Sequence, residues 1–218
     1  MDIFLQQIVN GLVQGSIYAL VALGYTMVYG IMGLINFAHG EVVMIGTLVT
    51  ITVAGTLLKA GMPVALAGLA GLTAAVLVCM ALGWALERIA YRPLRNAPRL
   101  TPLITAIGMS IVLQNLAMMI WGRNYLTFPA LLPKIDFELA GANFTAIQVV
   151  IVLVSATTMG GLLFLVYRTK LGMAMRATSQ NPAVASLMGV NINRVIAAAF
   201  VIGSALGALA GVDRKSVV

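Results

Sequence analysis

Charged residues are absent from six long stretches of this 218-residue chain, and this pattern restricts the fold more than any other feature. The stretches are 17 to 38 residues long and cover 3–40, 42–58, 60–86, 100–122, 139–167 and 195–212. About 20 apolar helical residues cross the hydrocarbon core of a bilayer. A charge at the centre of such a helix costs roughly 2.5–3.5 kcal/mol on insertion. The sequence therefore predicts an all-α fold, a polytopic transmembrane helical bundle of about six spans.

The composition excludes other classes of protein. Hydrophobic residues make up 61% of the chain, charged residues 9%, and the mean hydropathy is +1.03, which is outside the range of an ordinary soluble domain. The apolar stretches are continuous rather than alternating with period two, so they do not describe an outer-membrane barrel. The net charge of +7 comes mostly from basic residues in short connections, so we expect a bilayer and not nucleic acid as the partner of these charges.

Basic residues gather in two of the connections. They are Arg88, Arg92, Arg95 and Arg99 after the third stretch, and Arg168, Lys170, Arg176 and Arg194 after the fifth. Short loops rich in Lys and Arg stay in the cytoplasm. This places 88–101 and 168–194 inside, with 59–63, 123–145 and the N-terminus outside. The basic pair at 214–215 follows the last stretch and does not fit this orientation.

Sequence motifs for catalysis or for a cofactor are missing. The single cysteine, Cys79, lies in an apolar stretch, so neither a disulfide nor a thiolate metal site is expected. The lone histidine has no second ligand at metal-binding spacing. No P-loop, nucleophile elbow or H-E-x-x-H sequence occurs. We therefore expect no cofactor and no enzyme, and any ATP hydrolysis that drives transport must belong to another chain. No Lys or Arg precedes the first stretch, so we expect it to remain as a span.

Two groups of small residues predict close packing of helices. Gly203, Gly207 and Gly211 repeat every four residues, and Gly11, Gly15 and Ala19 do the same. Small residues at this spacing allow two helix backbones to approach closely in lipid.

The first stretch also has a polar and aromatic face. Its members recur at spacings of three, four or seven: Gln7, Asn10, Gln14, Tyr18, Tyr25 and Tyr29. Such a face in hydrocarbon is turned to the protein interior or to a watery path. Both hydrogen bonding inside the bundle and the lining of a path remain open.

The segment 30–41 predicts a broken helix. The uncharged stretch that contains it is too long for one span and too short for two spans with a loop. It holds Gly30, Gly33, Asn36, Phe37, His39, Gly40 and Glu41. Broken helices at membrane depth are tolerated where they line a cavity, and their backbone groups can hold a substrate. A structural turn and a proton relay through His39 and Glu41 are the alternatives.

A short helix is predicted at 182–188 in the second basic connection. Asn181 suits the N-cap, Pro182 the first helical position, and Gly189 the residue beyond the last turn. Val184, Leu187 and Met188 would share one apolar side. That side could lie on the lipid surface or in a groove of a soluble partner.

Three blocks resemble the inner-membrane permeases of bacterial ABC importers for branched-chain amino acids, the LivH type. They are NGLVQGSIYALVALGYTMVYGIMGLINFAHGEVVMIG, RPLRNAPRLTPLITAIGMSIVLQN and YRTKLGMAMRATSQNPAVASLMGVNINRVIAAAFVIGSALGALAGV. The likeness covers 1–212, which we interpret as a partial transmembrane permease domain with an atypical tail at 213–218. Permeases of this family continue with further spans, so the chain resembles a truncated product.

The resemblance implies a location, partners and site residues. The location is the bacterial inner membrane, and the partners are a second related permease, two cytoplasmic ATPase subunits and a periplasmic binding protein. With the polar face of the first stretch added, the predicted substrate path involves Gln14, Tyr18, Tyr25, Asn36, Phe37, His39, Gly40 and Glu41. With the apolar side of the short helix added, contact with the ATPase would involve Arg176, Ala177, Asn181, Val184, Ala185, Leu187, Met188 and Gly189. A proton-coupled channel or intramembrane enzyme that uses His39 and Glu41 is the rival hypothesis, and a purely structural scaffold is another.

Overall fold

The computed structural model describes residues 2–95, 97–98, 100–123, 136–139 and 142–212. The tail at 213–218, the basic pair within it, Arg99 and most of the predicted outer loop lie outside these residues. The elements follow in the order α1 (Asp2–Met32), α2 (His39–Lys59), α3 (Val64–Ala85), a turn of π-helix η1 (Leu86–Tyr91), a 3₁₀ turn η2 (Arg92–Leu94), α4 (Leu100–Trp121), β1 (Asp136–Leu139), β2 (Ala142–Thr145), α5 (Ala146–Arg168), α6 (Lys170–Gln180), α7 (Pro182–Leu187) and α8 (Ile192–Val212).

Six of the helical segments are long and apolar enough to cross a membrane, as predicted. They are Phe4–Met32, His39–Lys59, Val64–Leu94, Leu100–Trp121, Gln148–Arg168 and Ile192–Gly211. The chain is therefore a multi-pass membrane protein built as a helical bundle. The structure adds one small element to the all-α fold. Strands β1 and β2 form an antiparallel hairpin, in which Asp136 pairs with Thr145 and Leu139 with Ala142. The polar and apolar residues of Asp136–Leu139 do alternate as in a strand, but the pattern is only four residues long.

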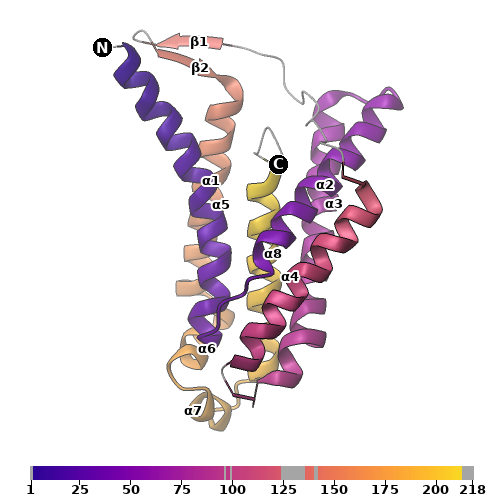
Figure 1. The fold of residues 1–218 in the computed structure, drawn as a ribbon. Helices are drawn as coiled ribbons and strands as arrows, with labels where there is room; N and C mark the ends of the chain where they lie inside the picture. Colours follow the sequence, from indigo (N-terminus) through magenta and orange to yellow (C-terminus); the bar gives the residue numbers. More distant parts are fainter. Residues whose placement is uncertain (1, 96, 99, 124–135, 140–141, 213–218) are drawn as a thin grey trace.

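The connections are sorted between the two ends of the bundle (Figure 1). The N-terminus, the turn from α2 to α3 and the hairpin lie at one end, at the top of the view, and α6 and α7 lie at the other. The same sorting follows from loop charge, because both strongly basic connections are predicted on one side. The alternation of the spans thus agrees with the prediction.

Helix α8 is the centre of the bundle and packs against α1, α2 and α3. The predicted glycine stripe makes these contacts close. A Cβ atom at Gly203 would lie 2.8 Å from the carbonyl oxygen of Gly24 in α1, and one at Gly211 would lie 2.8 Å from that of Val43 in α2. By contrast, a Cβ at Gly11 or Gly15 would have no neighbour within 4 Å. The prediction of close packing is therefore confirmed in α8 and is wrong for these two glycines within the described residues.

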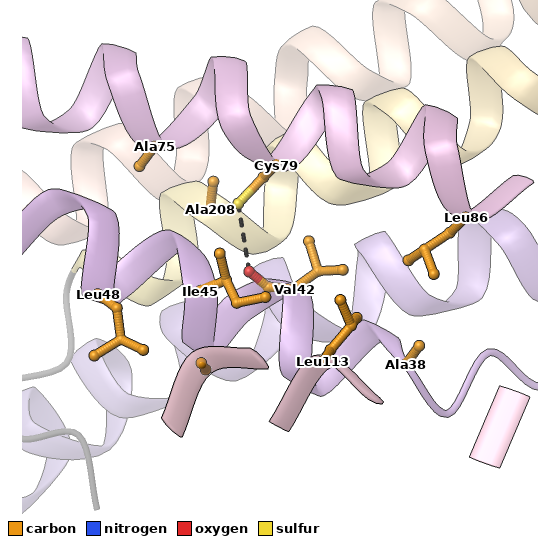
Figure 2. Packing of buried hydrophobic residues seen from close by; sticks show 10 residues of the cluster. Ala38, Val42, Ile45, Leu48, Ala75, Cys79, Leu86, Leu113 and Ala208 are labelled. Carbon is orange, nitrogen blue, oxygen red and sulfur yellow. Dashed lines mark hydrogen bonds between the residues drawn. The ribbon is translucent and has the colours of Figure 1, made fainter. Parts of the chain in front are cut away.

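A second region of tight packing joins α2 to α3, α4 and α8 (Figure 2). Val42 and Ile45 of α2 belong to one buried cluster with Cys79 of α3, Leu113 of α4 and Ala208 of α8. The Cys79 thiol donates a hydrogen bond to the Val42 carbonyl oxygen, with 3.3 Å between sulfur and oxygen. This cluster holds α2 firmly, which matters because the first residues of α2 belong to the candidate site.

Candidate functional site

The predicted helix break is present between Met32, the last residue of α1, and His39, the first of α2. Gly33 ends α1 with a φ of +64°, and its N–H donates to the Tyr29 carbonyl oxygen over 2.7 Å. A side chain at this left-handed position would be strained, which explains the glycine. The chain then runs without helix until the turn at Phe37 and Ala38.

Asn36 fixes the geometry of the break. Its side chain is buried, and its Oδ1 atom accepts hydrogen bonds from the Ala38 N–H at 3.1 Å and from the Tyr91 hydroxyl at 2.8 Å. The second bond reaches from the break to η1. A buried amide that is satisfied in this way is expensive to disturb, because loss of one partner leaves a desolvated polar atom.

His39 lies inside the bundle, between α1 and α8. Its side chain is 2% exposed. The Cε1 atom of its ring would lie 2.9 Å from a Cβ at Gly24 and 3.3 Å from one at Gly207. Only glycines leave room for the imidazole there. The Tyr25 ring contacts the His39 imidazole edge-on, with 6.2 Å between the ring centroids. The His39 Nε2 atom has no hydrogen-bond partner among the described residues.

The other three members of the cluster point elsewhere. Glu41 is turned toward α4, where its Oε1 atom accepts from the Ser110 hydroxyl at 3.0 Å and from the Gln114 amide at 2.7 Å. Phe37 and Gly40 are exposed. The five residues of the Asn36–Glu41 group are thus close along the backbone but lie in four different surroundings.

The polar face of α1 is divided as well. Tyr25 is half-buried against His39, whereas Gln14 and Tyr18 are exposed and join each other through a 3.4 Å hydrogen bond from the amide to the phenol oxygen. Gln14, Tyr18, Phe37 and Gly40 are therefore the exposed members of the predicted path.

The arrangement gives little support to catalysis or proton relay. His39 packs against α1 and α8, while Glu41 hydrogen-bonds to α4, so the two side chains serve different contacts. A catalytic site needs a base, a nucleophile and an orienting group within mutual reach. Among the residues that the structure describes, no group of three His, Cys, Asp or Glu side chains could hold a metal ion.

The predicted capped helix is present as α7, which ends at Leu187, one residue earlier than expected. The Asn181 Oδ1 atom accepts from the Val184 N–H at 3.2 Å, and Pro182 occupies the first turn. At the other end Gly189 has a φ of +82° and donates to the Ser186 carbonyl oxygen at 3.0 Å. The N–H of the next residue, Val190, reaches the Ala185 carbonyl oxygen at 3.1 Å. These two bonds form a Schellman motif.

The outer side of α7 is apolar and open. Val184 is 53%, Leu187 85% and Met188 80% exposed, while Ala185 is buried on the opposite side. Two helical turns have little stability of their own, so the contacts of Ala185 hold the helix against the bundle. We call the exposed set Val184, Leu187 and Met188 the α7 ridge.

Helix α6, which precedes α7, was not predicted. Thr169 caps it by accepting the Gly172 N–H at 3.1 Å. Its inner side places Met175 in a buried cluster with Val195 and Ala199 of α8. Its outer side carries Ala177, which is exposed, and Arg176, whose guanidinium lies 5.3 Å from the centroid of the Tyr167 ring. The signal was available, since a threonine cap precedes apolar residues at helical spacing.

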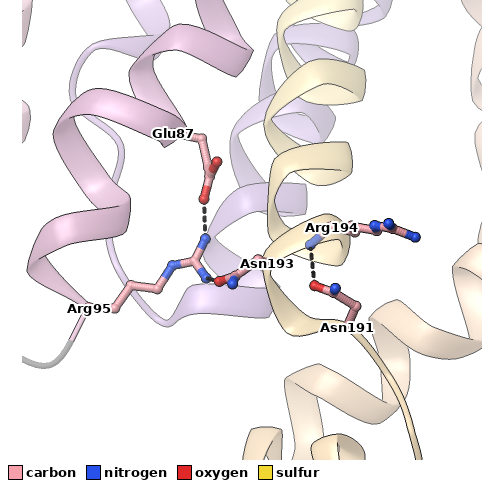
Figure 3. A network of polar contacts seen from close by, with 5 residues as sticks. All are labelled: Glu87, Arg95, Asn191, Asn193 and Arg194. Carbon is pink, nitrogen blue, oxygen red and sulfur yellow. Dashed lines mark hydrogen bonds and ion pairs between the residues drawn. The ribbon is translucent and has the colours of Figure 1, made fainter.

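A second missed feature is the network of Glu87, Arg95 and Asn193 (Figure 3). Glu87 in η1 is buried and forms an ion pair with Arg95, and the same guanidinium donates to the Asn193 Oδ1 atom at 2.5 Å. It joins the end of the third span to the start of α8, beside α7. Burial lowers the pKa of Arg95, and the charge of Glu87 opposes this effect. In the sequence Glu87 is the only acid near four arginines, but their spacing does not show which arginine pairs with it.

Comparisons with known proteins agree with this architecture. A family model described as the permease component of branched-chain amino acid transport systems matches residues 7–213. The chain is 46% identical to BraD, a high-affinity branched-chain amino acid transport system permease protein of Pseudomonas aeruginosa, over 96% of this chain and 70% of BraD. It is 45% identical to LivH of Escherichia coli, with the same coverage.

A more distant relative comes from an archaeon. The chain is 26% identical to a probable LivH permease of Methanocaldococcus jannaschii, over 93% of this chain and 63% of that protein. No solved structure matches the chain. The matched region includes the helix break, α7 and the glycine stripe of α8, and the chain belongs to the family of permease components of branched-chain amino acid transport systems.

Proposed function

We propose that the chain is a membrane-spanning permease subunit of an ATP-driven importer that moves branched-chain amino acids across the bacterial inner membrane. A second related permease, two cytoplasmic ATPase subunits and a periplasmic binding protein complete the importer. The names of the relatives support the substrate. The α7 ridge is the observation that carries the proposal, because it is a rigidly capped apolar surface at the basic end of the bundle.

The α7 ridge docks into a groove of an ATPase subunit. Leu187 and Met188 are at least 80% exposed in the chain alone. A partner that buries them gains roughly 1.5–3 kcal/mol for each side chain. Docking also couples the ATPase mechanically to the bundle. Helix α7 is joined directly to α6 and by a short turn to α8, the central helix. Displacement of the ridge is transmitted into the packed core.

The path for the substrate runs over the exposed part of the helix break. One wall consists of Gln14 and Tyr18 of α1, Phe37 in the break and Gly40 in the first turn of α2. The second permease supplies the opposite wall. Asn36, His39 and Glu41 position this wall through their contacts with η1, α8 and α4. Gly40 leaves room for the substrate, and the Phe37 ring offers an apolar surface. Such a wall suits the apolar side chain of an amino acid that passes without tight binding.

Replacement of Leu187 by Asp tests the docking of α7. The variant places a charge in the contact with the ATPase, and a buried, unpaired carboxylate costs several kcal/mol. We expect the ATPase to copurify at least tenfold less well, while the permease inserts normally because residue 187 is exposed. Ser179→Asp is the matched control, since it adds the same charge to an exposed position of α6.

Equal copurification of the ATPase with both variants would refute docking through the ridge. Loss of the ATPase from both variants would point to a general charge effect at this end of the protein, which also contradicts the proposal.

A further inference from the structure

A cavity of about 650 Å³ lies at the basic end of the bundle, where α1 ends and α8 begins. Ile31, Leu34 and Ile196 line its apolar part, and Arg92, Arg95 and Asn193 line its polar part. No acidic side chain from the described part of the chain lines it. This volume is typical of sites for small molecules or headgroups.

The charges at this cavity are not balanced. Glu87 neutralises only one of the two guanidinium groups, that of Arg95. Among the described residues no carboxylate pairs with Arg92, and the Nε atom of Arg95 is buried without a hydrogen-bond partner. The nearby charge of Arg92 disfavours protonated Arg95, as burial does. An anion between the two guanidinium groups would remove this repulsion and accept charge-assisted hydrogen bonds from Arg92.

We propose that this cavity binds a phosphate group, carried by an acidic phospholipid of the surrounding membrane. The phosphate lies between Arg92 and Arg95, and the glycerol and the upper acyl chain lie against Ile31, Leu34 and Ile196. The location favours a lipid, because the ends of three spans supply part of the lining, including Ile31, Arg92 and Ile196. Helices α6 and α7 and the connections between helices supply the rest. Basic pockets at this depth are suited to anionic headgroups. The inference does not depend on the substrate of the importer.

Native mass spectrometry of the purified chain tests the site. The protein is released from nanodiscs that contain either phosphatidylglycerol or phosphatidylcholine, and retained lipid is counted. We expect phosphatidylglycerol to be retained preferentially, and its occupancy to fall about tenfold or more in Arg92→Gln, as the loss of a charge-assisted contact implies. Arg88→Gln is the matched control, because Arg88 lies on the neighbouring turn, is exposed and does not line the cavity.

The second arm separates lipid from free anion. Millimolar inorganic phosphate is added to the protein in phosphatidylcholine nanodiscs, and the melting temperature is measured. Stabilisation of the wild type but not of Arg92→Gln, without retained phosphatidylglycerol, would assign the site to free phosphate. Arg92→Lys keeps the charge and should keep part of the binding, even if the glutamine variant fails to fold. Equal retention of both lipids with no phosphate effect, or equal loss in Arg92→Gln and Arg88→Gln, would overturn the proposal.

Discussion

Glycines with the same spacing have different roles in this molecule. In α8 they lie where the backbones of α1 and α2 approach, and Gly203 has no room for even a methyl group. In α1, Gly11 and Gly15 are exposed and have open space around them. Small residues at four-residue spacing show only that another helix can approach closely. Whether a helix packs there depends on the rest of the fold.

Replacement of Gly203 by Ala should therefore destabilise the protein. The added methyl carbon would lie 2.8 Å from the Gly24 carbonyl oxygen, and backbone cannot give way as a flexible side chain does. Forced overpacking of this kind costs about 1–3 kcal/mol, visible as a lower melting temperature of the detergent-solubilised chain. Gly15→Ala makes the same chemical change in open space and should be neutral or slightly stabilising. Equal melting temperatures for the two variants would show that the α1–α8 contact is looser than described.

Predictability at the residue scale depends on the range of the interaction. Asn181 and Gly189 act on their own helix through hydrogen bonds a few residues away, so the cap rules found α7 to within one residue. The surroundings of His39 and Glu41 are set by α8 and α4, which are far away in the sequence. Their closeness along the chain suggested a joint role, whereas in the fold they face different helices.

At the scale of elements, the break between α1 and α2 is the most informative feature. The length of the first uncharged stretch predicted it, because 38 residues fit neither one span nor two spans with a loop. Asn36 and Gly33 then explain how the chain stops one helix and starts the next. The start of α2 is left with one side packed and one side exposed, and the exposed side contains Gly40.

Replacement of Gly40 by Val tests the proposed path. A Cβ at Gly40 meets nothing within 4 Å, so the fold should tolerate the branched side chain, but the wall of the path becomes bulkier. We expect uptake of leucine by the assembled importer to fall several-fold while the amount of permease in the membrane is unchanged. Gly30→Val is the matched control. Gly30 is exposed near the end of α1, and a Cβ there also meets nothing within 4 Å. It lies on the side of α1 away from Gln14 and Tyr18. If both variants transport normally, the path does not pass this face.

Helix α6 and the network of Glu87, Arg95 and Asn193 were not predicted, for different physical reasons. Helix α6 has a recognisable cap, but its amphipathic side is short, and the basic residues of the connection interrupt the apolar pattern. The network of Glu87, Arg95 and Asn193 joins positions that are about a hundred residues apart. Only the packing of the third span against α8 brings them together, and no local pattern contains that information.

At the scale of the whole molecule, the distribution of charge predicts the orientation in the membrane. The end with α6 and α7 carries the basic connections, so we expect it in the cytoplasm. Single-cysteine labelling checks this. Met62→Cys should react with a membrane-impermeant maleimide only from outside, and Ser179→Cys only from the cytoplasm, since both positions are exposed.

The native cysteine should not interfere with this labelling experiment. The native Cys79 is fully buried and hydrogen-bonded, so it should stay unlabelled in the folded protein. Labelling of residue 62 from the cytoplasmic side would reverse the orientation and would remove the α7 ridge from the compartment where ATP is hydrolysed.

The most direct measurement is leucine uptake by proteoliposomes that contain this chain with the proposed second permease and ATPase subunits. ATP is supplied on the α7 side and the binding protein on the opposite side. We predict that uptake requires both, that it is lost in Leu187→Asp, and that it persists in Ser179→Asp. Uptake driven by an imposed pH gradient without ATP, or full ATP-driven uptake by Leu187→Asp, would contradict a permease that is coupled to its ATPase through α7.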